Sequence, residues 1–257
     1  RPARLRGGTM GRTKRWLRLW VPPILYRWAA GLVRTEKRAF RGLHGLDRAL
    51  AEHLDLSRPG FYVELGANDG LLQSNTYFLE FIYGWRGVLI EPALNNYLSL
   101  IRNRSRENAF FCVACVSFNH PDEFVRMTYA NLMSISASLN MDLPDADQHV
   151  KDGTRFLGDS REVVDFGAVA RPLSNLLREA EAPPQIELLS LDVEGAELEV
   201  LRGVDHEQHR FTHIVVECRD VARLDAYLRN VGYHRVAQIS AHDFVYVDAR
   251  EAQLRTS

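Results

Sequence analysis

The sequence predicts an α/β protein whose mostly parallel sheet is wound on both faces by helices, as in Rossmann-like folds. From residue 56 onward, short runs rich in Val, Ile, Leu and aromatic residues alternate with helical patterns. These runs are almost continuously apolar, which indicates strands that are buried on both faces. Such doubly wound sheets bind their ligands at the carboxyl ends of the strands.

Seven apolar runs are expected to form the strands, and the last two lie close enough in sequence to close the sheet with an antiparallel pair. The expected strands are residues 60–65, 86–92, 109–118, 186–193, 212–218, 233–240 and 242–248. The helical patterns between them cover residues 71–84, 93–104, 194–203 and 220–232. This alternation defines a main domain over residues 56–250.

Three further segments lie outside the alternation. Residues 1–55 are expected to form a basic, Trp-rich extension with helical character, and residues 251–257 form a tail. Residues 119–171 hold one short hairpin pattern followed by a polar run. A stretch of this length without clear elements is usually functional, so we expect it to cap the binding site and carry the substrate specificity.

Charge is divided unevenly along the chain. Residues 1–43 hold 12 Lys and Arg and one acid, whereas the remainder holds 20 Lys and Arg and 32 acids. The acidic body argues against non-specific nucleic-acid binding. Basic residues interleaved with tryptophans favour a peripheral contact with an anionic membrane surface, and packing on the body or on a partner is the alternative.

The three cysteines cannot build a disulfide framework, which favours a reducing, cytoplasmic setting. Cys112 and Cys115 form a C-x-x-C pattern within an expected strand. A spacing of three places their side chains on opposite faces, so we interpret them as structural cysteines and not as zinc ligands or a redox pair.

The stretch "VELGANDG" joins the first expected strand to a glycine loop. Gly66 and Gly70 allow tight turns and close approach of a ligand. Asn68 stands where a dinucleotide fingerprint has its second glycine. Glu64 favours a ligand with positive charge, such as the sulfonium of S-adenosylmethionine, and the start of the next helix would suit a carboxylate or phosphate. A plain strand-to-helix turn is the alternative.

The stretch "LIEP" places Glu91 at the end of the second expected strand. An acid at this position can accept both ribose hydroxyls of an adenosine. NAD and S-adenosylmethionine both carry that ribose, so Glu91 indicates a nucleoside without choosing between them. An exposed glutamate at the end of a strand is the alternative.

The stretch "LLSLDVEGAELEVLRG" places three acids in one strand-to-helix connection: Asp192, Glu194 and Glu197. Acids near a helix N-terminus are stabilised by the helix dipole, which accounts for Glu197 and is an alternative for Glu194. Asp192 ends a central strand, and Glu217 holds the equivalent place on the next one. These two acids are therefore candidates for chemistry.

The three stretches together resemble the landmarks of the FkbM family of S-adenosylmethionine-dependent methyltransferases, in order and in spacing. "RPLSNLLREAEAPPQIELL" resembles the helix that precedes the third landmark. The resemblance spans about residues 59–248 and implies a class I methyltransferase fold with a seven-stranded sheet. It also implies O-methylation of sugars or of polyketide hydroxyls.

The resemblance further implies roles for individual residues. Glu91 would hold the ribose, Ala114 and Cys115 would lie near the adenine, and Asp192 and Glu194 would face the methyl-transfer site. The methionine half of the cofactor would be lined by Glu64, Gly66, Ala67, Asn68 and Gly70. Asp69 within the first loop departs from the family pattern by adding an acid beside this site.

A general base is expected because a sugar hydroxyl is a weak nucleophile near neutral pH. Asp192 is the first candidate and Glu194 the second, while Glu217 would orient the acceptor. Glu217 and Asp192 holding Mg²⁺ is a weaker alternative, and no dedicated metal site is predicted.

The sequence thus predicts an S-adenosylmethionine-dependent O-methyltransferase. Its acceptor would be a small molecule or glycan: a sugar, a glycolipid or polysaccharide precursor, or a polyketide-like compound. Two alternatives stay open, an NAD-dependent oxidoreductase or epimerase and a catalytically idle, membrane-associated binding module. The missing second glycine and Glu64 weigh against the former.

Overall fold

The computed structural model describes residues 38–129, 135–136 and 164–250. The chain divides into two compact units, residues 1–39 and 40–257, and the boundary expected at residue 55 falls inside the second unit. Residues 1–37 of the predicted extension, with its membrane contact, lie outside the described residues, as do most of the polar run of residues 119–171 (the insert) and the tail. All described residues from 40 onward belong to the second unit.

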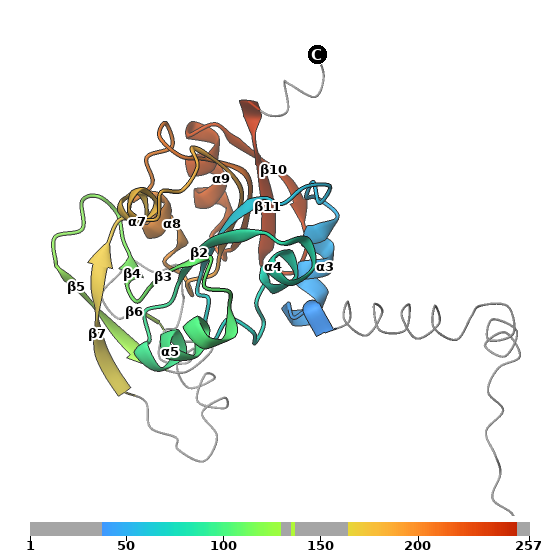
Figure 1. Cartoon of the computed structure of the whole chain (residues 1–257). Coiled ribbons are helices and arrows are strands. Elements are labelled where there is room, and N and C mark those ends of the chain that lie inside the picture. Colours follow the sequence, from blue (N-terminus) through green and yellow to red (C-terminus); the bar gives the residue numbers. More distant parts are fainter. Residues whose placement is uncertain (1–37, 130–134, 137–163, 251–257) are drawn as a thin grey trace, which may run out of the picture. The chain divides into compact units, whose positions relative to one another are not determined.

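The second unit is built on a seven-stranded sheet with the strand order β10-β11-β9-β8-β1-β2-β3. The central pairs are parallel, whereas β11 lies antiparallel to both β9 and β10. This confirms the predicted mostly parallel sheet with an antiparallel C-terminal edge (Figure 1). The strands are β1 (Phe61–Leu65), β2 (Arg86–Ile90), β3 (Ala109–Phe111), β8 (Gln185–Leu191), β9 (Arg210–Glu217), β10 (Tyr233–Gln238) and β11 (Asp243–Asp248).

Helices cover both faces of this sheet. Leucines and valines from α7 (Leu173–Glu179), α8 (Glu197–Leu201) and α9 (Val221–Asn230) share one core cluster with side chains from β1, β2, β8 and β9. On the opposite face, Tyr62 of β1 donates a hydrogen bond to Glu80 of α4 (Tyr77–Tyr83). The residues that face the core from α5 (Leu94–Asn103) include the fully buried Leu100. The sheet is therefore doubly wound, as the continuous apolar strands predicted.

The insert and the residues just before it form a second sheet. This changes the bounds expected for the third strand and for the insert. The expected third strand, residues 109–118, divides into β3 in the main sheet and β4 (Ala114–Cys115), which pairs with β7 (Val164–Arg171). β7 also pairs with β5 (Phe124–Tyr129), and β6 (Ile135–Ser136) completes the order β4-β7-β5-β6. Val116, Val125 and Ala168 form its buried core. The flanks of the insert are thus regular strands.

The helix expected over residues 71–84 begins only at Tyr77. Gln73 adopts a left-handed backbone with φ of 59°, and the hydroxyls of Ser74 and Thr76 bond to Glu64 instead of continuing a helical turn. Short polar side chains that bond to nearby groups compete with helix formation, so residues 71–76 extend the glycine loop. No helix N-terminus therefore follows directly on Gly70.

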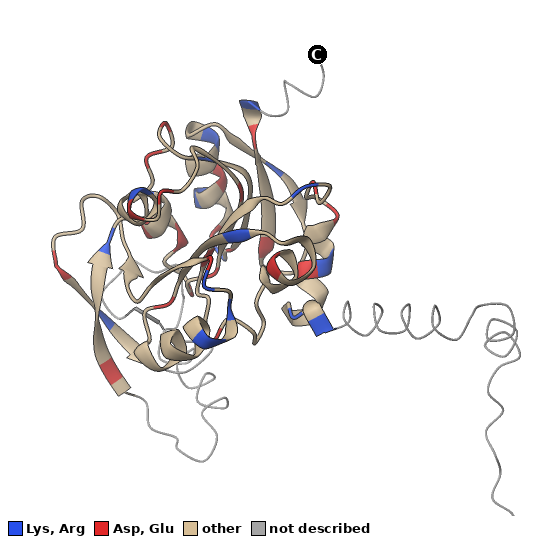
Figure 2. Cartoon of the chain, viewed as in Figure 1, with Lys and Arg blue, Asp and Glu red and all other residues tan. Residues whose placement is uncertain are grey.

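Acidic and basic residues are interspersed over the described strands and helices (Figure 2). Within residues 38–129, 135–136 and 164–250, no helix combines the length and apolar character that crossing a bilayer requires.

Candidate functional site

The loop after β1 turns back against the end of β8. Gly66 has φ of 75°, and a Cβ placed there would lie 1.9 Å from the backbone oxygen of Asp192. Asn68 is also left-handed, with φ of 47°. The carboxylate of Asp69 was expected to lie beside the ligand. It accepts hydrogen bonds from the backbone amides of Leu71 and Leu72 and so stabilises the loop. Only glycine fits position 66, because the loop contacts the neighbouring strand end directly.

Ala67 and Gly70 hold the backbone of this loop against β2 and Arg104. Ala67 is buried, and its amide donates to the carbonyl of Ile90 at the end of β2. Gly70 has φ of 79°, and a Cβ there would lie 2.8 Å from Cγ of Arg104. Neither residue lines a cavity at this edge of the sheet, so both act by shaping the backbone.

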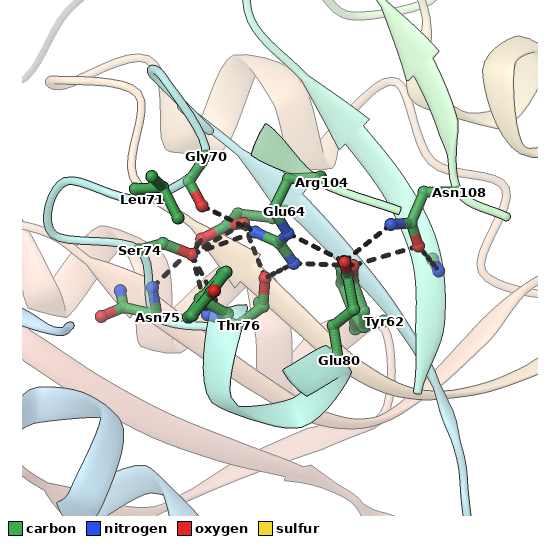
Figure 3. Close-up of polar contacts among 12 residues, drawn as sticks. Tyr62, Glu64, Gly70, Leu71, Ser74, Asn75, Thr76, Glu80, Arg104 and Asn108 are labelled. Carbon is green, nitrogen blue, oxygen red and sulfur yellow. Dashed lines mark hydrogen bonds and ion pairs between the residues drawn. The ribbon is translucent and has the colours of Figure 1, made fainter. Parts of the chain in front are cut away.

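Glu64 lies at the centre of a buried polar network (Figure 3). Its carboxylate accepts hydrogen bonds from Ser74 Oγ at 2.9 Å and Thr76 Oγ1 at 2.6 Å. Arg104, with a fully buried side chain, donates from Nη1 at 3.2 Å. The carboxylate of Glu64 is therefore paired with a cation of the protein itself, Arg104. It stabilises the loop and does not line the central cavity described below.

Arg104 joins the rest of this network to the loop. Its guanidinium also donates to the Gly70 carbonyl at 3.3 Å, to Tyr62 Oη at 2.7 Å and to Glu80 Oε2 at 2.8 Å. Burial by itself would raise the pKa of Glu80, but Arg104 and its hydrogen bonds hold that pKa below its ordinary value. One guanidinium thus serves two carboxylates, those of Glu64 and Glu80. The network was not expected from the sequence, since no local pattern marks Arg104 as a partner of β1.

Glu91 follows β2 and is buried against the same loop. Its two oxygens accept the backbone amides of Asn68 and Ala93, each at 2.9 Å. Burial raises the pKa of Glu91 to about 7, against the opposing effect of these bonds and of one from Asn96. The ends of β1 and β2 thus meet, as the sequence predicted for two adjacent parallel strands.

Asp192 follows β8 and stands among acids. Burial, followed by the charges of Glu194, Glu217, Glu197 and Asp243, raises its pKa well above the ordinary value. Its Oδ1 is buried and has no hydrogen-bond partner among the described residues. A carboxylate in these surroundings gains from accepting a proton, which suits a general base.

The two other acids of the third stretch differ in role. Glu197 accepts the amides of Val193 and Gly195 at 3.2 and 3.0 Å, so it caps the connection, as the alternative interpretation expected. Glu194 has a left-handed backbone with φ of 55° and lines the cavities beside Asp192. Glu217, at the end of β9, lies 4.0 Å from Arg219 in an ion pair.

Three cavities adjoin at this edge of the sheet. The central cavity, about 100 Å³, is lined by Gly66, Asn68, Leu72, Gln73, Ser74, Glu91, Pro92, Met127, Asp192, Val193 and Glu194. A second cavity, which we call the apolar cavity, shares four lining residues with the central one: Gly66, Pro92, Met127 and Val193. Its other lining residues are Leu65, Ile90, Val113, Ala114, Cys115 and Ala196. The acidic cavity, about 390 Å³, shares Gln73, Asp192 and Glu194 with the central one.

The apolar cavity explains the placement of Ala114 and Cys115. They reach the site from β4 in the second sheet and not from the end of a single third strand. Burial raises the pKa of the Cys115 thiol, and Arg171 opposes this only in part, so Cys115 acts here as an apolar wall. Cys218 is buried too, while Cys112 is half-buried.

Backbone strain gathers around these cavities. The described residues include five non-glycine residues with positive φ, and four of them line the central or the acidic cavity: His44, Asn68, Gln73 and Glu194. Such conformations cost of order 1–3 kcal/mol each and cluster at functional sites. Gln73 and His44 carry no sequence signal for this role.

Within residues 38–129, 135–136 and 164–250, no three His, Cys, Asp or Glu side chains are grouped so that they could hold a metal ion. The arrangement instead offers an apolar compartment, a polar centre with Glu91, and Asp192, whose buried Oδ1 has no hydrogen-bond partner among the described residues.

Comparison with known proteins gives a family. The family model described as "Methyltransferase FkbM domain" matches residues 64–235. No curated protein matches the chain.

Solved structures resemble the chain at low identity. A structure titled methyltransferase FkbM from Methylobacillus flagellatus KT is 15% identical, with a TM-score of 0.44, and the match covers 74% of this chain and 43% of that one. The N-terminal domain of human METTL16 in complex with SAH is 11% identical, with a TM-score of 0.42 and coverage of 80% and 67%. A SAM-dependent methyltransferase from Aquifex aeolicus is 8% identical, with a TM-score of 0.40 and coverage of 78% and 88%.

Proposed function

Because the chain belongs to the FkbM methyltransferase domain family, we propose that it transfers a methyl group from S-adenosylmethionine to a hydroxyl oxygen. The acceptor is a sugar, a glycolipid or polysaccharide precursor, or a polyketide-like small molecule. The observation that carries this proposal is the row of three adjoining cavities, with Glu91 in the central one and Asp192 where the central and acidic cavities meet.

The residues present fit S-adenosylmethionine. An adenine ring requires an apolar slot, which Ala114, Cys115 and Val113 provide. A ribose requires hydrogen-bond acceptors, which Glu91 provides beside the Asn68 backbone. A glycine at position 66 leaves the loop free of a side chain where the central and apolar cavities join.

When bound, S-adenosylmethionine supplies an electrophilic methyl group and leaves as the neutral thioether. The remaining work belongs to this chain. The loop of residues 66–76 and Glu91 orient the cofactor, and orientation of two reactants lowers the entropic barrier to their reaction. Asp192 accepts the proton of the acceptor hydroxyl. Burial, followed by the charges of Glu194 and Glu217, raises its pKa above the ordinary value, which favours uptake of that proton.

The first test is calorimetric titration of the full chain with S-adenosylhomocysteine, with NAD titrated in parallel. Micromolar binding of S-adenosylhomocysteine is expected, weakened about tenfold or more in Glu91→Ala, because a hydrogen bond to a charged group contributes about 1.5–3 kcal/mol. Glu107→Ala, which changes an exposed glutamate, is the matched control.

Two outcomes would contradict the proposal. Binding of NAD in place of S-adenosylhomocysteine would indicate an oxidoreductase or epimerase, and binding of neither would indicate an idle module. Once the cofactor is established, NMR identification of the new methyl group on oxygen, as opposed to nitrogen or carbon, tests the acceptor atom.

A further inference from the structure

The acidic cavity lies beside the central one, on the side away from the apolar cavity. Four segments line it: residues 43–46, 73–75, 217–219 and 240–243, together with Asp192 and Glu194. It is the larger of the two cavities that contain Asp192. Among the residues that the structure describes, none of those lining it comes from residues 119–171, the insert in which the sequence placed substrate specificity.

The walls of this cavity are fastened by specific contacts. Asp47 of α3 (Leu46–Ala51) is buried and accepts the amides of Arg41 and Gly42, which fixes the segment ahead of η1 (Leu43–Gly45). Gly42 in turn forms a parallel bridge with Gln73. On the other side, the Ser240 hydroxyl donates to Asp243. Hydrogen bonds within the fold therefore hold two of the segments that line the cavity.

Two hydrogen-bond acceptors in its walls lack partners among the residues that the structure describes. Asp192 Oδ1 and Asn75 Oδ1 are both buried without a hydrogen bond within the described part of the chain. A buried acceptor left without a partner costs about 1–3 kcal/mol. Such groups are retained where a ligand supplies the missing donor, and hydroxyl groups are donors of the right kind.

The charge of the walls restricts the ligand. Among the described residues, four carboxyl groups line the cavity, from Asp192, Glu194, Glu217 and Asp243, against one guanidinium, that of Arg219. Glu217 already pairs with that guanidinium at 4.0 Å. Even with both lining histidines, His44 and His242, protonated, the carboxylates outnumber the cations. A phosphate or carboxylate group would therefore be repelled.

We propose that the acidic cavity is the acceptor site and that it takes an uncharged, polyhydroxylated compound such as a neutral sugar unit. This inference rests on the proposed methyl transfer and deepens it. In this proposal, Asn75 Oδ1 accepts a hydrogen bond from one hydroxyl of the sugar, and Asp192 accepts a hydrogen bond from the hydroxyl that becomes methylated. That oxygen forms its bond to the methyl carbon as the carbon–sulfur bond breaks, and its proton passes to Asp192.

Ala241→Trp tests the location. Ala241 is exposed at the rim of the acidic cavity and outside the central one, so a large side chain fills the former and leaves the latter open. Ala222→Trp, on the exposed face of α9, is the matched control. Melting temperatures of both variants verify folding, and titration with S-adenosylhomocysteine verifies the cofactor site.

The probes are methyl glycosides of glucose, mannose, galactose and rhamnose, and the 6-phosphates of the first three. Transfer of labelled methyl from S-adenosylmethionine is measured for each. We expect wild-type protein and Ala222→Trp to methylate at least one uncharged glycoside and to disfavour its 6-phosphate by at least tenfold. Ala241→Trp should bind S-adenosylhomocysteine within twofold of wild type and lose at least tenfold in kcat/KM.

The outcomes separate this inference from the proposed function. Unchanged kcat/KM in Ala241→Trp would place the acceptor elsewhere while leaving methyl transfer intact. Preference for a 6-phosphate, or transfer to none of the uncharged glycosides by a protein that binds S-adenosylhomocysteine, would overturn the acceptor class. Failure of wild-type protein to bind S-adenosylhomocysteine would overturn the proposed function itself.

A second variant tests the charge argument without altering shape. Glu217→Gln removes one carboxylate and releases Arg219 from its pair. We expect discrimination against the 6-phosphates to fall by about tenfold. Discrimination equal to that of wild type would mean that these walls do not select against anionic acceptors.

Discussion

Acids stand at the ends of two neighbouring parallel strands, β1 and β8, in opposite electrostatic surroundings. Glu64 is surrounded by donors, with Ser74, Thr76 and the buried Arg104 all bonding to its carboxylate. Asp192, which follows the strand paired with β1, has a buried oxygen without a partner among the described residues and acids on several sides. The two positions are adjacent, yet one is neutralised and the other is not.

This difference separates a structural acid from a chemical one. A buried charge with a full set of partners is held in one state and stabilises the loop around it. A buried acid without partners is poised to take up a proton or a hydroxyl donor. The Arg104 network should therefore govern stability, and the Asp192 region should govern activity.

The largest expected effect is on the Arg104 side. Arg104→Met leaves the buried Glu64 and the partly buried Glu80 without their cation, so the free energy of unfolding should fall by about 3–5 kcal/mol. Urea denaturation followed by circular dichroism measures this. Arg106→Met, at an exposed position, should change the free energy by less than about 0.5 kcal/mol. A loss below about 1 kcal/mol in Arg104→Met would show that the network is not the main support of the loop.

Asp192→Asn should have the converse effect. The removal of a general base lowers kcat by at least about 100-fold, because general base catalysis contributes about 10²–10⁴. The free energy of unfolding should stay level or rise, since the variant removes a charge that its neighbours repel. Methyl-transfer kinetics and urea denaturation provide the two readouts, with Glu207→Gln at an exposed ion pair as control. A large loss of stability with kcat retained would reverse the assignment.

Glu91 extends the comparison to pH. Its pKa is about 7 in the folded protein, against an ordinary value of 4.5, so between these pH values the folded state binds more protons than the unfolded state. Stability should therefore fall as pH rises from about 5 to 7, with Glu91 contributing up to about 3 kcal/mol. Urea denaturation at pH 5 and pH 7.5 should show a smaller fall in Glu91→Gln than in wild-type protein. Equal falls in both would mean that Glu91 keeps an ordinary pKa.

The smallest expected effects on the free energy of unfolding come from removing single polar groups. Tyr62→Phe removes the hydroxyl that accepts from Arg104 and should cost about 1–2 kcal/mol of unfolding free energy. Asn75→Ala removes an oxygen that has no partner in the described residues, so it should cost no more than about 0.5 kcal/mol. Thermal and urea unfolding of the two variants side by side test this, and a larger cost for Asn75→Ala would contradict it.

Much of the site could be predicted from the sequence because it depends on strand ends. Apolar runs locate the strands, and adjacent parallel strands bring their carboxyl ends together, so Glu91 meets Asn68 as expected. The prediction was wrong where side chains compete with local propensity. Residues 71–76 carry a helical pattern, but Ser74 and Thr76 bond to Glu64 and the helix starts at Tyr77.

The sequence by itself determined the doubly wound sheet, its antiparallel edge and the row of acids at the strand ends, because continuous apolar runs and short connections leave few other arrangements. The tertiary structure alone decided which acids are paired. Arg104 lies 40 residues from Glu64, and His44 and His242 reach the acidic cavity from segments far apart in the chain. Whether a carboxylate stays charged depends on burial and on the charges around it, and both are properties of the folded chain.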